Sequence, residues 1–221
     1  MPQRRVIVLS AVEFEAKHIA RALNLVRQSR RNWTGGPVGG FEISLFVVGI
    51  RAISLPPLEA GFADYVVMAG FAGALDPALK VGDILIEADS DNHGMSTLHT
   101  VPNIICTPAE KAAMFRQTQA RAVEMENRIV RKWAADLSIP FVAIRSISDT
   151  ADQHLEPATF QFIDEFGSTN PRALAVALLR NPKLVVPLNQ LRRNGSLAAR
   201  RLAEAVQDWL LRRGATGHEV P

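Results

Sequence analysis

The sequence predicts an α/β fold, with a twisted, mostly parallel or mixed central sheet in a three-layer arrangement between helices. Short runs dense in Val and Ile alternate with helical stretches along the chain. Within most of these runs polar and apolar residues do not alternate, as expected for strands that are buried on both faces. The 221 residues, 48% hydrophobic and 21% charged, have an ordinary globular composition and can bury a large core. Disordered and low-complexity classes are therefore excluded.

The individual elements follow from local signals. The clearest helix start is segment 107–110 (TPAE), where Thr is the N-cap, Pro the first helical residue and Glu the third. The glycine-rich segment 35–40 lacks the strand–GxGxxG–helix order of a dinucleotide site, so we interpret it as a turn between strands. Strands are expected at residues 6–11, 42–48, 65–69, 83–87 and 141–147, with 103–106 as a weaker candidate, and helices are expected to begin near Glu13, Pro108, Arg121, Pro157, Pro171 and Ser196.

The chain is expected to form one domain with a distinctive end. Residues 1–170 are the expected α/β domain, and residues 171–221 a helical, Arg-rich extension of that same domain. From residue 192 to 213 the chain has six arginines against two acids, Glu204 and Asp208. Such a helix face is either solvated or meets an anionic surface. The six are Arg192, Arg193, Arg200, Arg201, Arg212 and Arg213.

Composition excludes several classes of function. The net charge of +3 is too small to indicate nucleic-acid binding. A single cysteine, Cys106, excludes a disulfide framework and a zinc site made only of cysteines. The apolar run 6–12 ends at Glu13 without a cleavage site, so it reads as a buried first strand rather than a signal peptide. We therefore expect a cytoplasmic protein.

Three groups of polar residues follow predicted strands, at the sheet edge where α/β proteins bind ligands. They lie in segments 10–15, 69–74 and 144–152, and a fourth group, 122–126, is expected to open a helix. Singly, each has a simple structural explanation, such as acids at a helix N-terminus, a tight glycine turn or a helix cap. Together they predict several carboxylates at one sheet edge with few cations nearby.

The four groups together resemble the nucleoside phosphorylase superfamily, and within it the methylthioadenosine/S-adenosylhomocysteine nucleosidase branch. The resemblance runs in the right order through about two-thirds of the chain. It rests on an acidic turn at 11–15 (AVEFE), a glycine turn and strand at 70–86 (GFAGALDPALKVGDILI), a ribose-binding element at 122–126 (AVEME) and a catalytic loop at 147–152 (ISDTAD).

This resemblance implies cleavage of a purine N-glycosidic bond. Asp149 matches the family's general acid toward N7 of the purine, and Ser148 matches the residue that orients it. Such an acid works near neutral pH only if burial and neighbouring carboxylates favour its protonated form. Glu15 matches the carboxylate that activates water, and Glu13 is the alternative because it lies only two residues away.

Other residues are implied in substrate binding. Glu126 matches the carboxylate that accepts hydrogen bonds from the ribose hydroxyls, and Met125 would pack on the sugar. Asn127 stands where a small residue is expected. Glu124 also belongs to the ribose motif, Gly70, Phe71 and Ala72 form the glycine turn, and His93, His99 and Phe71 are candidates to line the base or the 5′ substituent.

The nucleophile is the main choice that the resemblance leaves open. Family phosphorylases hold phosphate with Arg and with Ser or Thr in the glycine turn, whereas the matching positions here are Met68 and Phe71. Hydrolysis is therefore favoured. Arg51 is a possible phosphate ligand, so phosphorolysis, which would make the protein a glycosyltransferase, is the first alternative. A non-catalytic nucleoside-binding protein is the second.

The expected partner is a small purine nucleoside, with no nucleic acid, metal or organic cofactor implied. Segments 107–113 and 124–126 and the Arg-rich end also resemble the hopanoid-associated phosphorylase subgroup, which removes adenine from a lipid-linked adenosyl intermediate. The C-terminal helix could then dock on the domain, pair with a partner or contact a membrane peripherally. A homo-oligomer, by default a dimer, is usual in the family.

Overall fold

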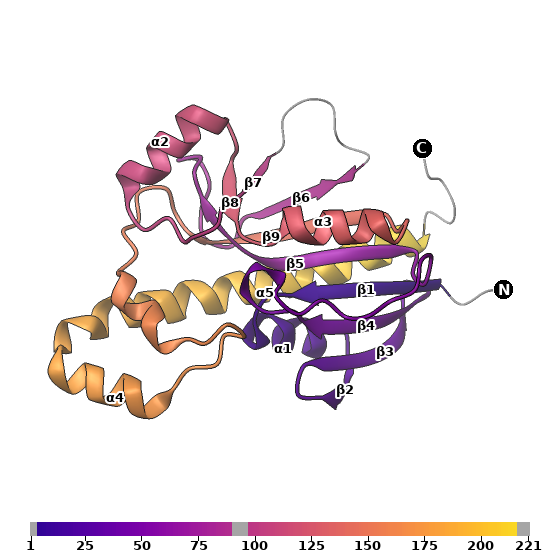
Figure 1. The fold of residues 1–221 in the computed structure, drawn as a ribbon, viewed down its shortest axis with the longest axis horizontal. Helices are drawn as coiled ribbons and strands as arrows, with labels where there is room; N and C mark the ends of the chain where they lie inside the picture. The colour runs from indigo at the N-terminus through magenta and orange to yellow at the C-terminus, as the bar shows by residue number, and fades with distance from the viewer. Residues whose placement is uncertain (1–3, 90–96, 216–221) are drawn as a thin grey trace.

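The computed structural model describes residues 4–89 and 97–215, which form a nine-stranded mixed sheet covered by helices (Figure 1). The strands are β1 (Arg4–Ser10), β2 (Val26–Ser29), β3 (Asn32–Val38), β4 (Phe41–Val47), β5 (Tyr65–Ala74), β6 (Ile84–Ala88), β7 (Leu98–Thr100), β8 (Ala122–Glu124) and β9 (Phe141–Asp149). The helices are α1 (Glu13–Ala22), α2 (Pro108–Thr118), α3 (Asn127–Asp136), α4 (Pro171–Arg180) and α5 (Val185–Ala215), with short 3-10 turns η1 (Ile50–Ala52), η3 (Pro157–Phe162) and η4 (Pro182–Leu184).

The centre of the sheet is parallel and its margins are antiparallel. Strands β4, β1, β5 and β9 are neighbours and run in one direction. β3 pairs antiparallel with β4, β6 with β9, and β8 with β5. This is the mixed α/β fold that the sequence predicts, and it brings the carboxyl ends of β1, β5 and β9 to one edge.

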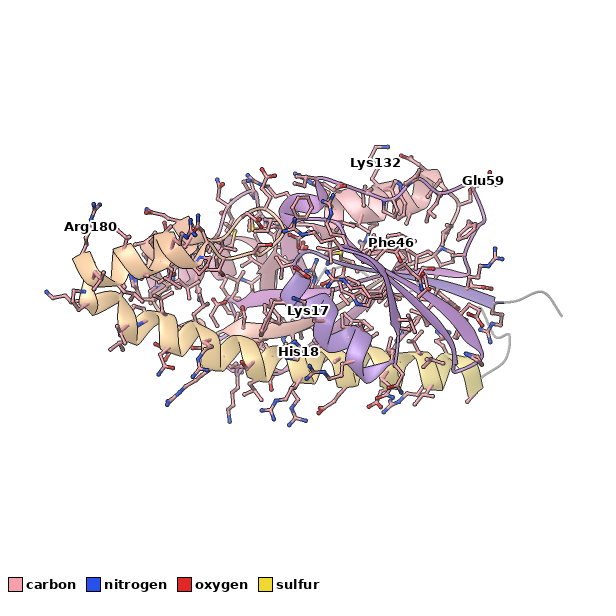
Figure 2. All side chains as sticks on the ribbon, turned by 90° about the horizontal axis from the view of Figure 1, so that it is seen from below. Lys17, His18, Phe46, Glu59, Lys132 and Arg180 are labelled. Atoms are coloured by element: carbon pink, nitrogen blue, oxygen red, sulfur yellow. The ribbon has the colours of Figure 1, made fainter. Side chains whose placement is uncertain are left out.

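Each face of the sheet has its own core and its own helices. On one face Val130 and Ala134 of α3 pack with Ile7, Val66 and Met68. On the other, buried residues of α1 and α5 pack with Val6, Val8 and other residues of the sheet. Figure 2 shows α1 and α5 on the same side of the sheet, with Lys132 of α3 on the opposite side. The strands are apolar on both faces because both faces are covered.

All five predicted strands are present, but several details differ. Residues 103–106 are not a strand, and the segment near Pro157 is only a 3-10 turn. The helix expected near Arg121 begins at Asn127, because residues 122–124 first form β8. The glycine segment 35–40 belongs mostly to β3, and only Gly39 and Gly40 form the turn. Strands β2, β3, β7 and β8 carried no sequence signal, as they are short, exposed or rich in glycine.

The second half of the C-terminal helix packs into the core of the domain. α5 begins at Val185, eleven residues before the expected Ser196, and its second half packs on α1, β5 and β9. Leu202, Val206 and Leu210 are completely buried there. Its end lies against the β3–β4 turn, where a Cβ on Gly214 would stand 1.9 Å from the Gly39 carbonyl oxygen. The apolar stripe that suggested an interaction surface is therefore used within the chain.

We expect Leu202→Ala to lower the free energy of unfolding by about 2–5 kcal/mol, because it opens a cavity in a close-packed core. Leu211→Ala, later in the same helix at a position that is 49% exposed, is the matched control and should change it by less than about 0.5 kcal/mol. Urea unfolding of the two variants and the parent measures both effects. Equal effects would mean that α5 does not contribute to the core as described.

Candidate active site

Two glycines of β5 make room for the polar residues of β9. We expected a glycine turn after residue 69, but β5 continues to Ala74. Gly70 pairs with Arg145 and Gly73 with Asp149 in the parallel register. A Cβ on Gly70 would lie 2.7 Å from Nη1 of Arg145, and one on Gly73 would lie 3.0 Å from Oδ2 of Asp149. The glycines therefore serve close approach rather than turning of the chain.

Glu15 is held in place by hydrogen bonds from uncharged donors. The side chain lies in the first turn of α1 and is 3% exposed. Its Oε2 accepts from the Ser10 hydroxyl at 2.7 Å, and its Oε1 from the Phe71 backbone N–H at 2.9 Å. Burial raises the pKa of Glu15, the nearby Glu126 raises it further, and the two hydrogen bonds and Arg145 oppose that rise. The alternative, Glu13, is ion-paired with Lys17 and Arg27 outside this group.

A buried arginine binds the two glutamates of the ribose motif. The guanidinium of Arg145, 1% exposed, donates to Oε2 of Glu124 at 2.7 Å and to Oε2 of Glu126 at 3.2 Å. It also donates to Oδ1 of Asn127 at 2.6 Å and to the Phe71 carbonyl at 3.3 Å. Asn127, which departs from the small residue expected there, is thus a partner of Arg145.

Glu124 and Glu126 have different surroundings within this network. Oε2 of Glu124 also accepts from the backbone N–H groups of Glu126 and Asn127, both at 2.7 Å, and its Oε1 from the Thr100 hydroxyl. Glu124 therefore fixes the start of α3. Glu126 accepts from the Arg51 backbone N–H at 3.0 Å, and burial, the largest cause, raises its pKa against the opposing effect of Arg145.

Asp149 has a buried lysine as its neighbour, not further carboxylates as we expected. Nζ of Lys111, a residue of α2, lies 2.5 Å from Oδ2 of Asp149. The Ser148 hydroxyl donates to Oδ1 at 2.7 Å. The expectation of few cations at this edge is wrong, because two cationic side chains, Arg145 and Lys111, are buried there.

Several other candidates occupy less direct positions. The Phe71 ring packs on Phe14 of α1, with 6.4 Å between centroids, while its backbone bonds Glu15. Arg51 has an exposed side chain and a left-handed backbone, with φ of 64°. Met125 is half-buried, whereas Ala72 and Met68 are buried. His99 lies in β7 and is half-buried, and His93 lies outside the described residues.

Two further chemistries can be assessed at this edge. Within residues 4–89 and 97–215, no group of three or more His, Cys, Asp or Glu side chains has the geometry to hold a metal ion. Burial raises the pKa of the Cys106 thiol, with contributions from nearby carboxylates, and this disfavours a thiolate nucleophile. The carboxylates and the two cations are thus the groups that could act on a substrate.

The phosphorylase superfamily model matches residues 97–180, which include Lys111, Glu126, Arg145 and Asp149. The 5′-methylthioadenosine/S-adenosylhomocysteine nucleosidase of Pseudoalteromonas translucida is 28% identical over 225 residues, covering 78% of this chain and 95% of the relative. Over residues 97–180 the chain is similar to the phosphorylase superfamily. The nucleosidase of the same description from Baumannia cicadellinicola is 28% identical over 197 residues, covering 66% of this chain and 86% of the relative.

Solved structures share the fold of this chain. MTAN of Chlamydia trachomatis bound to MTA superposes with a TM-score of 0.61 at 16% identity, covering 92% of this chain and 95% of that one. The 5′-methylthioadenosine/S-adenosyl homocysteine nucleosidase of Helicobacter pylori gives a TM-score of 0.61 at 14% identity, covering 99% and 100%.

Sequence reasoning missed several contacts that support these carboxylates. Lys111 and Thr100 are ordinary polar residues within a helix and a strand, and no spacing links them to the acids. Ser10 and Asn127 lie within or beside the predicted segments, but the sequence assigned them no part in holding the carboxylates. Arg145 did carry a signal, because it interrupts the apolar run 141–147 of a strand expected to be buried on both faces. A charged residue at such a position is almost never buried without a partner.

We expect Arg145→Met to lower the free energy of unfolding by about 3–5 kcal/mol, because it leaves Glu124 and Glu126 buried without their cation. Arg128→Met, on the exposed surface of α3, is the control and should stay within about 0.5 kcal/mol of the parent protein. Urea unfolding at pH 7 measures the difference. Similar losses in the two variants would contradict the central place given to Arg145.

Proposed function

We propose that the protein is a purine N-ribosidase that hydrolyses the N-glycosidic bond of an adenosine-type nucleoside. The observation that carries the proposal is the set of buried carboxylates at the carboxyl edge of the sheet, Glu15, Glu126 and Asp149, each held by hydrogen bonds in a fixed orientation. The relatives named methylthioadenosine/S-adenosylhomocysteine nucleosidases support the same reaction and substrate class.

In the proposed reaction Glu15 activates water and Asp149 assists departure of the base. The water oxygen bonds to C1′ of the ribose while its proton passes to the Glu15 carboxylate. The electron pair of the broken C1′–N9 bond goes to the purine, which takes a proton from Asp149 at N7. The raised pKa of Glu15 makes its carboxylate a better proton acceptor, and this suits it to the role of base. Ser148 keeps Asp149 oriented.

The sugar is proposed to bind at Glu126. Each oxygen of this carboxylate accepts one hydrogen bond, from the Arg51 backbone N–H and from Arg145, so lone pairs remain for two ribose hydroxyls. Met125, half-buried beside it, supplies an apolar contact to the sugar. Glu124 supports this site by fixing the start of α3. In β5, Gly70 lies against Arg145, and the Ala72 carbonyl accepts from the Ser148 hydroxyl.

Phosphorolysis is the second candidate, and the arrangement favours hydrolysis. Met68 is buried in the core and the Phe71 ring packs on α1, so neither offers a ligand to phosphate. The Phe71 N–H already donates to Glu15. Arg51 alone, with its exposed side chain next to Glu126, keeps a phosphate site open.

We also propose that the helical hairpin formed by α4, η4 and the first half of α5 contacts an anionic membrane surface. Residues 166–203 contain seven Arg or Lys and no Asp or Glu. Apolar side chains are exposed on the same hairpin, with Leu179 at 83%, Val186 at 73%, Val185 at 53% and Val176 at 47%. Exposed apolar residues among cations fit the interface of an anionic bilayer.

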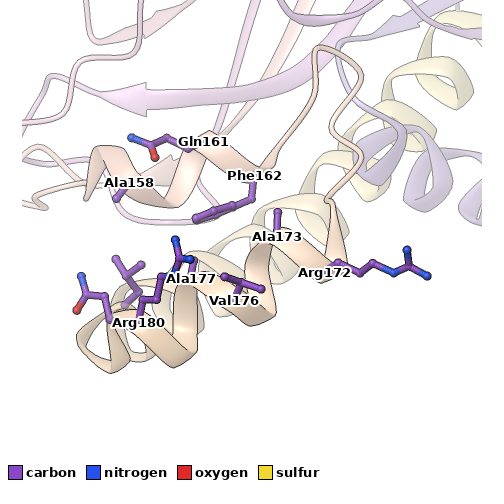
Figure 3. A pocket seen from close by; sticks show the side chains of 10 residues that line it. Ala158, Gln161, Phe162, Arg172, Ala173, Val176, Ala177 and Arg180 are labelled. Atoms are coloured by element: carbon purple, nitrogen blue, oxygen red, sulfur yellow. The ribbon is translucent and has the colours of Figure 1, made fainter.

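A groove beside the hairpin adds to this surface. It has a volume of about 570 Å³ and lies between η3 and α4. Phe162 stands over Ala173 and Val176 in it, and Arg172 and Arg180 are among its lining residues (Figure 3). No helix of the described residues is both long and apolar enough to cross a bilayer, so the proposed contact is with the surface only.

A homodimer and a cytoplasmic location stay predictions from the sequence and its family resemblance.

Adenine release from methylthioadenosine and adenosine, with and without phosphate, tests the proposed reaction. We expect release that does not require phosphate and that falls by about 10²–10⁴ in Asp149→Asn and in Glu15→Gln, since each loses one proton-transfer partner. Glu13→Gln, two residues from Glu15, is the control and should keep its activity. Strict dependence on phosphate would show a phosphorylase, and tight binding without release a nucleoside-binding protein.

Vesicle co-sedimentation tests the membrane contact. The full chain is used, because removal of α5 would destroy the core. We expect binding to vesicles containing an anionic phospholipid, and much weaker binding by the Leu179→Glu/Val186→Glu variant, with nucleoside cleavage unchanged. Leu211→Glu, exposed outside the hairpin, is the matched control. Equal binding by the hairpin variant, or none by the parent protein, would rule out this contact.

A further inference from the structure

Lys111 is the one residue of α2 that is buried, and its ammonium group has three acceptors. Nζ lies 2.5 Å from Oδ2 of Asp149, 2.7 Å from the Thr150 carbonyl oxygen and 3.4 Å from the Gln153 carbonyl oxygen. An ammonium group has three protons to donate, so each can be matched with one acceptor. This lysine is fully satisfied although its exposed fraction is 0%.

Helix α2 is built so that this side chain reaches Asp149. A helix on a protein surface normally buries apolar residues, and burial of a cation is costly unless it is paired. The start of α2 is fixed by a capping box, in which the Thr107 side chain accepts from the Glu110 N–H while the Glu110 carboxylate accepts from the Thr107 N–H. Lys111 follows directly, so the cap sets its position on the helix.

We propose that Lys111 is the positioning residue of Asp149, and that the proposed acid works as one half of a lysine–aspartate pair. This inference rests on the function proposed above. Lys111 holds Oδ2 and the turn at Thr150 and Gln153, while Ser148 holds Oδ1, so the carboxyl group is fixed from both sides. The Lys111 charge then stabilises the carboxylate that Asp149 becomes when it gives its proton to the purine.

The proton balance of this step is simple. The proton on Asp149 passes to N7 as the glycosidic electron pair moves to the base, and Lys111 keeps its three protons throughout. A cation this close stabilises the negative charge that a carboxyl group acquires when it gives up its proton.

The surroundings contain two further titratable groups that interact with the pair. Cys106 interacts with both Asp149 and Lys111, and Asp152 interacts with Lys111. On the side of β5 the group facing Asp149 is Gly73, which has no side chain to titrate. The Lys111 charge is therefore the closest one to Asp149, and its removal should dominate any change in pH dependence.

The first test compares the pH–rate profile of the parent protein with that of Lys111→Met, which is similar in length and uncharged. We expect kcat to fall at least about tenfold with little change in KM, and the alkaline limb to move up by about one pH unit or more. Lys132→Met, at an exposed position of α3, should change neither. A lower kcat with an unmoved alkaline limb would reduce Lys111 to a structural residue and overturn the proposal.

The second test does not depend on turnover. The carboxyl carbon of Asp149 is followed by carbon-13 NMR across pH in the ligand-free protein and assigned by its loss in Asp149→Asn. We expect its titration midpoint to lie higher in Lys111→Met than in the parent protein. If the parent protein released no base, the proposed function would be wrong. The NMR titration would still show whether the charges of Lys111 and Asp149 interact.

If Lys111→Met does not fold, the same coupling can be read from the lysine side. Nitrogen-15 NMR of the Lys111 ammonium group should show it protonated to higher pH in the parent protein than in Asp149→Asn, since each charge stabilises the other. An equal midpoint in the two proteins would overturn the proposal.

Discussion

The guanidinium of Arg145 is the interaction on which the site depends. Two carboxylates and an amide of segment 124–127 and the backbone carbonyl of Phe71 converge on it. The two carboxylates could not be buried so close together without the cation, because isolated charges in a low-dielectric interior are strongly unfavourable. Arg145 in turn fits only because its cross-strand neighbour is Gly70. The glycine, the arginine and the ribose motif are therefore one structural unit.

The sequence predicts the frame of the molecule better than its supporting contacts. Runs of Val and Ile revealed the central strands, because a strand covered on both faces must be apolar throughout. The short strands β7 and β8 depend on pairing with each other and with β5, a tertiary effect with no local pattern. The sequence left open whether the Arg-rich end docks on the domain. In the fold its arginines lie on the outer face of α5, and apolar residues between them, such as Leu202 and Val206, enter the core.

The candidate site shows the same division. Glu15, Glu126 and Asp149 stand in recognisable motifs at strand ends, so the resemblance predicted them. Which side chains enter the site could be predicted only in part. The choice between Glu13 and Glu15, for example, depends on which of them faces the sheet where α1 begins. Lys111 reaches the site from α2, about forty residues before Asp149 along the chain, and only the folded chain relates the two.

The two buried cations divide the carboxylates into groups with different chemistry. Arg145 bonds Glu124 and Glu126, and Lys111 bonds Asp149. The carboxylate of Glu15 instead accepts from a hydroxyl and backbone N–H groups, and burial raises its pKa. Burial away from any directly bonded cation raises the pKa of Glu15, whereas Glu124, Glu126 and Asp149 are each held by a fixed positive charge. The placement of Lys111 and Arg145 thus gives the carboxylates of one sheet edge different electrostatic surroundings, as the proposed roles of base, ribose ligand and acid require.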